Sequence, residues 1–184
     1  MTSRERETYR HGDLRAAALA AAIAIVEKNG SNALALRGVA DAVGVAHRSL
    51  YRHFKDREAL IDAVAAEAYR RLAASVKVSR TPKEFAKRYA SFALTEPHLY
   101  DAMMSRTSAS ISQDAELKEA ADNLIAISLG VLSDPAEEVE TRRRQVMKLW
   151  MGLHGGLSLH RSGLLRARSN RAFTEELLRV LELP

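Results

Sequence analysis

The chain has 184 residues, of which 47% are hydrophobic and 5% aromatic, so it contains enough apolar material to build a packed core. It has no cysteine, which excludes disulfides, thiolate metal sites and cysteine nucleophiles. A formal net charge of +5 is compatible with a polyanionic partner, although charge alone is weak evidence for one. No apolar run approaches the ~20 residues of a bilayer span, and the charged start lacks a signal-peptide pattern, so we expect a soluble cytoplasmic protein.

Apolar residues recur at helical spacing along most of the chain, and no segment alternates in the way that a strand does, so we predict an all-α fold. In chain order, about nine helices are predicted, over residues 13–29, 36–43, 47–53, 57–76, 82–95, 97–104, 115–132, 135–163 and 170–181. Gly30 is expected to end the first helix in a left-handed conformation. Residues 105–113 are polar and serine-rich, which indicates a loop or a fraying helix end. Asp134-Pro135, followed by two glutamates, predicts a helix start.

Residues 36–51 contain the most informative pattern. Two short helices that cross steeply need a small residue at the crossing, and Ala40 provides one. The turn between them needs a residue that tolerates a positive φ, and Gly44 follows four positions later. Apolar residues, among them Val39 and Leu50, can fill the angle between the helices. The spacing predicts a helix-turn-helix, and two unrelated short core helices remain the alternative.

The outward face of the second of these helices is polar and cationic, with no acid before Asp56. Such a surface can donate hydrogen bonds to phosphates and to base edges in a major groove. An ordinary solvated helix face is the alternative interpretation. The outward residues, with the cations that follow them, are His47, Arg48, Ser49, Tyr51, Arg52, His53, Lys55 and Arg57.

Residues 9–68 resemble the DNA-binding domain of TetR/AcrR-type transcriptional regulators. The resemblance rests on Gly44-Val45 and on the run from Leu50 to Leu60, which is similar to the family's tyrosine, histidine-phenylalanine, lysine and leucine signature. Farther along, residues 89–100 and 150–156 resemble the branch named for its tryptophan-histidine-glycine region. The resemblance implies a three-helix DNA-binding domain over residues 1–56 and a helical ligand-binding and dimerisation domain over residues 57–184.

The resemblance also implies roles for single residues. His47 and Arg48 match base-reading positions, and Arg37 matches a position that reaches a base from the first motif helix. Tyr51 matches a contact to phosphate or a thymine methyl, and Ser49 and Arg57 match phosphate contacts. The full predicted DNA-binding set is Arg37, His47, Arg48, Ser49, Tyr51, Arg52, His53, Lys55 and Arg57.

The chain departs from the family pattern at two points. Ala35 and Leu36 stand where members often have a serine or threonine that caps the helix and contacts a phosphate, which puts that backbone contact in doubt. Arg48 replaces a small residue or proline, so we expect a changed operator preference.

Apolar stripes in the last two predicted helices indicate a helix-helix interface, and Gly152 and Gly156 allow a close approach. The resemblance implies that these helices form a four-helix bundle with a second copy, giving a homodimer on a palindromic operator. The alternative is that both stripes complete the core of one chain. The predicted dimer residues are Leu149, Gly152, Leu153, Gly156, Leu157, Phe173, Leu177 and Leu181.

The resemblance further implies a small-molecule effector that releases the protein from DNA. Aromatic, methionine and aliphatic residues with a few polar tips are typical of such a cavity, although the same stripe is also typical of plain core. The candidate lining residues are Tyr89, Phe92, Tyr100, Met103, Met104, Leu124, Ile127, Trp150 and His154.

Two other functions are alternatives to the regulator. An enzyme is disfavoured because His154 and His160 are six apart rather than at the four-residue spacing of a helical zinc pair, and because Gly156–His160 lacks the closing glycine of a nucleophile elbow. We therefore expect no catalytic residue, metal or cofactor. A helical protein-interaction module that has lost DNA binding is the remaining alternative, and the sequence leaves activation or repression open.

Overall fold

The computed structural model describes residues 11–183, and within that range the chain is entirely helical, as predicted. The helices are α1 (His11–Asn29), η1 (Ser31–Ala33, a 3-10 turn), α2 (Leu36–Val43), α3 (His47–Leu50), α4 (Arg57–Lys77), α5 (Pro82–Thr95), α6 (Pro97–Met104), α7 (Ser108–Gln113), α8 (Ala115–Leu132), α9 (Val139–Arg161) and α10 (Asn170–Val180).

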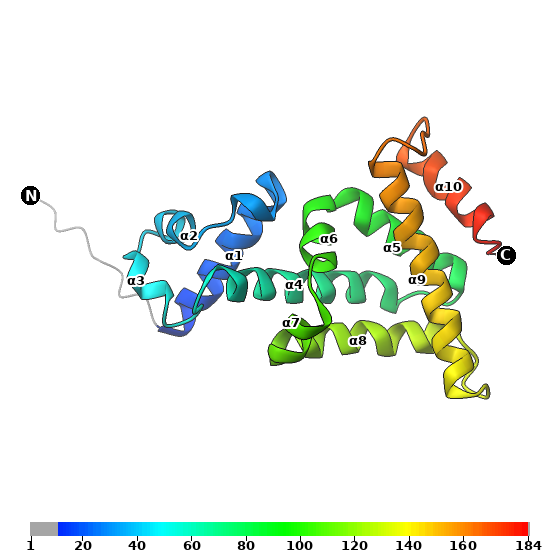
Figure 1. The fold of residues 1–184 in the computed structure, drawn as a ribbon, viewed down its shortest axis with the longest axis horizontal. Coiled ribbons are helices and arrows are strands. Elements are labelled where there is room, and N and C mark those ends of the chain that lie inside the picture. The colour runs from blue at the N-terminus through cyan, green and yellow to red at the C-terminus, as the bar shows by residue number, and fades with distance from the viewer. Residues whose placement is uncertain (1–10, 184) are drawn as a thin grey trace, which may run out of the picture.

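The molecule is elongated, and two regions lie along it (Figure 1). A head formed by α1, α2 and α3 occupies one end, and α4 runs from this head into a larger body. Within the body α4 packs against α5, α6 and α8, while α9 and α10 lie at the far end. Because α4 belongs to both regions, it is the main mechanical link between them.

Side-chain caps explain where several helices begin. The Asp56 carboxylate accepts a hydrogen bond from the Ala59 N–H at the start of α4. Thr81 caps α5 in the same way just before Pro82, and Asp114 caps α8. Each of these side chains satisfies a backbone N–H that has no partner within its own helix.

Four local expectations need correction. Residues 108–113 form the short helix α7, and Thr107 caps it by accepting from the Ser110 N–H. Helix α3 ends at Leu50, three residues earlier than expected. Helix α9 begins at Val139 and not near Pro135, because the Asp134 carboxylate accepts from the Ala136 N–H and closes a separate turn. Gly30 has φ 77° but ψ 166°, so its positive φ leads into η1 rather than into a left-handed cap.

One hydrophobic core extends from the head into the body. It includes fully buried Val39 and Leu50 in the head, Val64 in α4, and Leu99 and Leu153 in the body. A smaller cluster joins alanines of α4 to Leu117 of α8, and these small side chains let the two helices approach closely. Within residues 11–183, no helix combines the length and the apolarity that crossing a membrane requires.

Candidate nucleic-acid interface and ligand cavity

The helix-turn-helix geometry predicted from the sequence is present. Gly44 ends α2 in the left-handed conformation, with φ 72° and ψ 32°. The Val45 N–H then donates to the Ala40 carbonyl at 3.0 Å, which closes the turn. Ala40 is buried at the crossing, and Leu50 anchors α3 in the core. These contacts hold α3 at a corner of the head.

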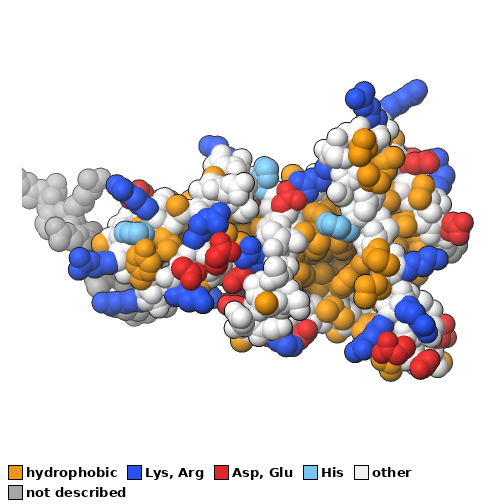
Figure 2. Space-filling model, in the orientation of Figure 1, with side chains coloured by type: hydrophobic (Ala, Val, Ile, Leu, Met, Phe, Trp, Pro, Cys, Tyr) orange, Lys and Arg blue, Asp and Glu red, His pale blue; other side chains and the backbone are white. Residues whose placement is uncertain are grey.

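The predicted DNA-reading side chains lie on the outside of that corner. His47, Arg48, Arg52 and Lys55 are exposed, and Tyr51 is 50% exposed although it is a large aromatic. On the face shown in Figure 2, several Lys and Arg side chains lie at this end of the molecule. Arg37 is likewise exposed, on α2, whereas Ser49 and His53 are half-buried.

Two features set the shape and charge of this face. The His47 ring meets the Tyr51 ring edge-on, with centroids 5.1 Å apart, so the two residues support each other one turn apart on the chain. No ion pair joins Arg37, Arg48 or Arg52 to any other residue in the described range. Their charges are therefore not offset by carboxylates of residues 11–183.

Neither motif helix has a side-chain cap. Ala35 precedes α2 and Ala46 precedes α3, and the methyl side chain of an alanine cannot accept a hydrogen bond from the first turn. The missing cap before α2 agrees with the departure seen in the sequence. The first N–H groups of both helices are left for water or for an anion.

Arg57 differs from the other predicted DNA contacts. Its guanidinium donates to the carbonyl of Leu34 at 2.8 Å and to the carbonyl of Ser31 at 2.7 Å, and it pairs with Glu58. The side chain thus holds the segment around η1 against the start of α4. In this arrangement Arg57 braces the head, with three of its N–H groups donating to partners within the chain.

Three charged clusters, which we call the junction, join the head to the body. Arg71 of α4 donates to Glu27 of α1 at 2.7 Å and to Glu96, which precedes α6, at 3.0 Å. Arg106, just after α6, donates to Glu58 at 3.1 Å and to Asp62 at 3.0 Å.

The third junction cluster centres on Glu116 of α8, which accepts from Arg15 of α1 and from Arg70 of α4. Burial alone would raise the pKa of Glu116, but the hydrogen bonds and charges of these two arginines together lower it below the ordinary value. The carboxylate is therefore held in its charged form.

In the body, three of the predicted effector residues form a hydrogen-bond chain. The Tyr89 hydroxyl of α5 lies 3.1 Å from the Tyr100 hydroxyl of α6, which lies 2.9 Å from Nδ1 of His154 on α9. Burial raises the pKa of both tyrosines, that of Tyr89 well above its usual value. Both hydroxyls are consequently neutral hydrogen-bond donors at physiological pH.

These hydrogen bonds lead to a cavity between α6 and α9 that has a volume of about 210 Å³. Two of the candidate effector residues, Tyr100 and His154, line it together with Asp101, Ser158 and Arg161, which the sequence interpretation did not include. The sequence spacing could have identified two of them, because Ser158 and Arg161 follow His154 at the i, i+4, i+7 spacing of one helix face. Hydrophobic side chains line a hollow on the same side of the body, between α6 and α9 (Figure 2).

The remaining candidate effector residues do not line that cavity. Phe92, Met103 and Leu124 are buried in the core, and Met104 and Ile127 pack against it half-buried. Trp150 is also half-buried, and its Nε1 atom is buried without a hydrogen-bond partner. Among residues 11–183, no three His, Asp or Glu side chains cluster in a way that could hold a metal ion.

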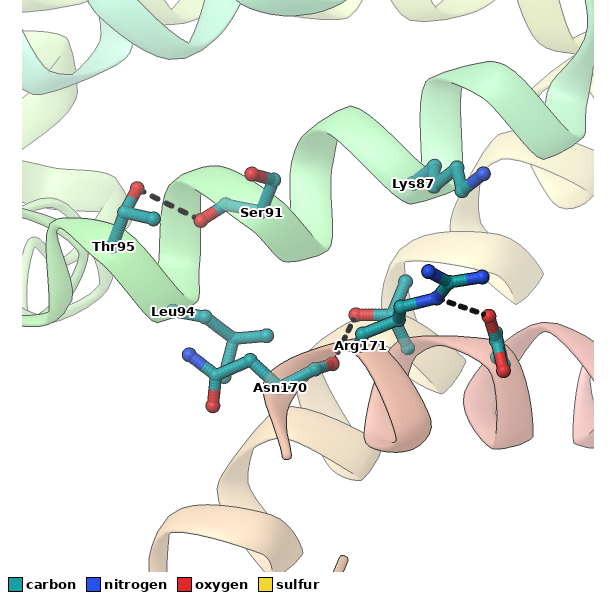
Figure 3. Close-up of a pocket in the computed structure, with 8 residues that line it drawn as sticks. Lys87, Ser91, Leu94, Thr95, Asn170 and Arg171 are labelled. Atoms are coloured by element: carbon teal, nitrogen blue, oxygen red, sulfur yellow. Dashed lines mark hydrogen bonds and ion pairs between the residues drawn. The ribbon is translucent and has the colours of Figure 1, made fainter. Parts of the chain in front are cut away.

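A second, larger cleft of about 530 Å³ lies between α5 and α10. Figure 3 shows Lys87 and Ser91 of α5 facing Asn170 and Arg171 of α10 across it. Arg171 donates to Glu175, and its side chain is 90% exposed. None of the predicted effector residues lines this cleft, whose walls are mostly exposed polar side chains.

The residues predicted to contact a second copy pack against other residues of the same chain. Leu149, Leu153 and Leu157 are buried, as are Phe173 and Leu177 of α10. A Cβ added to Gly156 would lie 2.4 Å from the Leu177 side chain, and one added to Gly152 would lie 2.3 Å from that of half-buried Leu181. The helix that fills the glycine groove is thus α10 of the same chain.

Other apolar side chains of these two helices remain on the surface. Met147 is 58% exposed and Met151 is 64% exposed, one turn apart on α9, and Val180 of α10 is 70% exposed. Gly155 lies on the same side of α9 with open space around it.

Comparison with known proteins agrees with this geometry. Residues 18–64 match the model of bacterial regulatory proteins of the tetR family, and residues 83–181 match the tetracyclin repressor-like C-terminal domain. The chain belongs to the TetR family. It is a DNA-binding transcriptional regulator with an N-terminal helix-turn-helix and a helical C-terminal domain, and the family is non-enzymatic.

Solved structures show the same fold. A protein with unknown function from Rhodococcus sp. RHA1 is 26% identical with a TM-score of 0.73, and the match covers 96% of this chain and 98% of that one. A TetR transcriptional regulator from Legionella pneumophila is 21% identical with a TM-score of 0.59, over 99% and 98% of the two chains. A TetR transcriptional regulator from Rhodococcus sp. RHA1 is 18% identical with a TM-score of 0.61, over 93% and 94%. No curated protein matches the chain in sequence.

Proposed function

We propose that this regulator is a repressor that binds a palindromic operator as a homodimer and leaves it when a small molecule binds the body. The observation that supports the proposal best is the corner-mounted α3, whose outward cations have no carboxylate partner among residues 11–183. A regulator of bacterial transcription acts where the DNA is, so we place it in the cytoplasm.

In this proposal, His47 and Arg48 read base edges from the start of α3, and Arg37 reaches a base from α2. Arg48 is the main specificity residue, because a guanidinium can donate two parallel hydrogen bonds to guanine. Ser49, Tyr51, Arg52, His53 and Lys55 contact the backbone or neighbouring bases. We assign Arg57 a bracing role, because its donors are engaged with carbonyls of the head.

The dimer forms through the exposed face of α9 and α10, and α10 packed on α9 provides half of the four-helix bundle. Met147, Met151 and Val180 are the apolar contacts, and Gly155 permits a close approach between helices. Two recognition helices joined in this way bind two half-sites with a higher effective concentration.

The effector site is the cavity between α6 and α9. Its position supports this role, because α6 is tied at both ends to α4, the helix that continues into the head. Glu96 precedes α6 and pairs with Arg71, which also pairs with Glu27 of α1, and Arg106 follows α6 and pairs with Glu58. We also retain membership of the tryptophan-histidine-glycine branch as a prediction.

The decisive experiment selects bound sequences from random duplex DNA with the full chain and then measures binding at two or more salt concentrations. We expect a palindromic consensus and an affinity that falls steeply with salt, since phosphate contacts release counterions. A protein-interaction module would select no consensus and show no salt-sensitive shift. A promoter fused to the selected sequence would then distinguish repression from activation.

A further inference from the structure

The two ends of α9 lie next to segments of opposite charge. Before α9, residues 134–140 contain four carboxylates and no Lys or Arg, and we call this segment the acidic turn. At the other end, residues 161–171 contain four arginines and no Asp or Glu, and we call this segment the basic loop. Helix α9 has 23 residues, which corresponds to a length of about 34 Å. The two segments therefore cannot neutralise each other within one chain (Figure 1).

The basic loop is held by hydrogen bonds and still exposes two leucines. The N–H groups of Leu164 and Leu165 both donate to the Leu159 carbonyl at 3.0 Å. The His160 ring donates from Nδ1 to the Leu165 carbonyl at 2.8 Å. Even so, the Leu164 side chain is 74% exposed and that of Leu165 is 46% exposed. An ordered loop that turns apolar side chains outward is typical of a contact surface.

The charges of both segments remain available to a partner. Arg166 and Arg168 form no ion pair with any residue in the described range, and neither does Glu138. Glu140 pairs with Arg143, but their side chains are 63% and 65% exposed. Exposed pairs of this kind contribute little to stability, so the Glu140 carboxylate can be shared with a second cation.

The position of the head determines the direction of a second α9. Figure 1 shows α9 running across the long axis of the molecule, with the head at one end of that axis. This step rests on the proposed function, in which both heads bind one operator. A two-fold axis along the long axis places both heads at the same end, and it reverses every helix that runs across it. The two α9 helices are then antiparallel, and each acidic turn lies beside the basic loop of the other chain.

The exposed side chains of α9 fit this arrangement. Met147 is 58% exposed, Met151 is 64% exposed and Leu159 is 43% exposed. Between them, Gly155 has open space where a side chain would stand. With the two-fold axis between Met151 and Gly155, each Met151 fills the space above Gly155 of the partner. In the same register, Met147 lies opposite Leu159, so large and small side chains alternate across the interface.

This register also brings opposite charges together. Glu140 lies near Arg166 of the partner, and Glu138 lies near Arg168 of the partner. The three arginines at 142–144 lie opposite residues 162–164, which have no charge. A parallel pair of α9 helices would instead place each segment against its own copy, where like charges repel. The charge pattern therefore favours the antiparallel pair.

We propose that the basic loop of each chain binds the acidic turn of its partner. The two equivalent contacts set the register of the dimer, and the exposed leucines of the loop are covered there. They also restrict the choice of partner, because both contacts form only between chains that each carry an acidic turn and a basic loop, or between chains with both charges exchanged.

Charge reversal tests the proposal on the full chain by sedimentation and native mass spectrometry. The variant E138K/E140K places a lysine opposite each partner arginine, and R166E/R168E places a glutamate opposite each partner carboxylate. Each variant alone should dimerise about tenfold or more weakly than the parent chain, because like charges then oppose each other. An equimolar mixture of the two should form a heterodimer, because opposite charges meet again at both contacts. High salt should weaken that heterodimer.

A matched control changes the charge by the same amount elsewhere. The variant E119K/D122K replaces two exposed carboxylates in the half of α8 that lies nearer the head. It should dimerise as the parent chain does, and it should form no preferred heterodimer with R166E/R168E. Circular dichroism of each variant checks that the fold is retained.

Cross-linking provides a second measurement that does not depend on reversed charges. Because the chain has no cysteine, introduced thiols are the only ones present. A short bismaleimide should join two chains of E140C/R166C, whose thiols stand at opposite ends of α9 and cannot be joined within one chain. E140C and R166C alone should stay unlinked, since equal positions meet only in a parallel pair.

The outcomes separate this inference from the proposed function. A parent chain that dimerises would overturn the inference if E138K/E140K and R166E/R168E dimerise as tightly as it does, if their mixture forms no heterodimer, or if the single cysteine variants cross-link. A parent chain that stays monomeric at high micromolar concentration refutes the proposed homodimer itself. A dimer that cross-links through E140C/R166C but selects no operator refutes the proposed function alone.

Discussion

The arginines of the α2–α3 face and those of the junction differ in what surrounds them. Arg37, Arg48 and Arg52 are exposed and form no ion pair with a residue in the described range. Arg71 contacts three carboxylates, and Arg106, whose side chain is 12% exposed, contacts two. The same residue type is thus exposed to solvent at one place, where we propose that it contacts DNA, and joins two parts of the protein at another. Substitutions should separate the two roles.

The largest effect is expected from Arg106→Met. Asp62, whose side chain is 15% exposed, would lose its partner. A largely buried carboxylate without a partner costs about 3 kcal/mol of unfolding free energy, which urea titration can measure. Arg179→Met is the control, because the exposed pair with Glu176 should contribute at most about 1 kcal/mol. An unchanged urea midpoint for Arg106→Met would show that the junction does not stabilise the fold.

Arg48→Ala should weaken DNA binding and leave the stability of the fold nearly unchanged. We expect a loss of roughly 1–3 kcal/mol on the selected operator, with relaxed preference at one base position. The unfolding free energy should stay within about 0.5 kcal/mol, since the side chain is exposed. Competition binding against random duplex DNA measures the first quantity. Equal weakening on both DNAs would make Arg48 a phosphate contact.

Arg57→Met tests a residue that shares features with both sets of arginines. It was predicted to contact DNA, as the arginines of the α2–α3 face were, but it forms hydrogen bonds within the chain, as the junction arginines do. Loss of its hydrogen bonds to the Leu34 and Ser31 carbonyls should lower the unfolding free energy by about 1 kcal/mol. The salt dependence of operator binding should be unchanged. A decrease of about one in that slope for each head would instead support the phosphate contact implied by the family resemblance.

The smallest effect concerns pH at the junction. Because the pKa of Glu116 is lowered in the folded state, its ion pairs stabilise the fold above the unfolded pKa of about 4.5. This contribution is lost as the pH falls through the lower folded value. The difference in unfolding free energy between the parent chain and Glu116→Gln should therefore shrink below about pH 4.5. A difference that grows on acidification would contradict the assignment.

The sequence predicted best those features whose causes are local. Gly44 and Ala40 lie within a few residues of the turn that they shape, and the cap at Thr81 acts on a backbone group three residues away. Helix α9 was placed too early because Asp134 and the following glutamates resemble a helix start. In the structure Asp134 closes a turn of its own.

Features that combine distant segments were predicted less well. The cavity depends on contact between Tyr100 and His154, which are 54 residues apart. Gly152 and Gly156 indicated correctly that a helix packs close to α9, but periodicity cannot tell whether that helix belongs to the same chain or to a second copy. The structure shows α10 of the same chain in that groove.

Trp150 gives the cavity an intrinsic optical reporter. It is the single tryptophan among 184 residues, and it stands one helical turn before His154. Its indole N–H is enclosed without an acceptor, so its emission should respond when the surroundings of that turn become more polar or supply an acceptor. Effector candidates can therefore be screened by tryptophan fluorescence on the unlabelled chain, because all of the tryptophan emission arises one helical turn from His154.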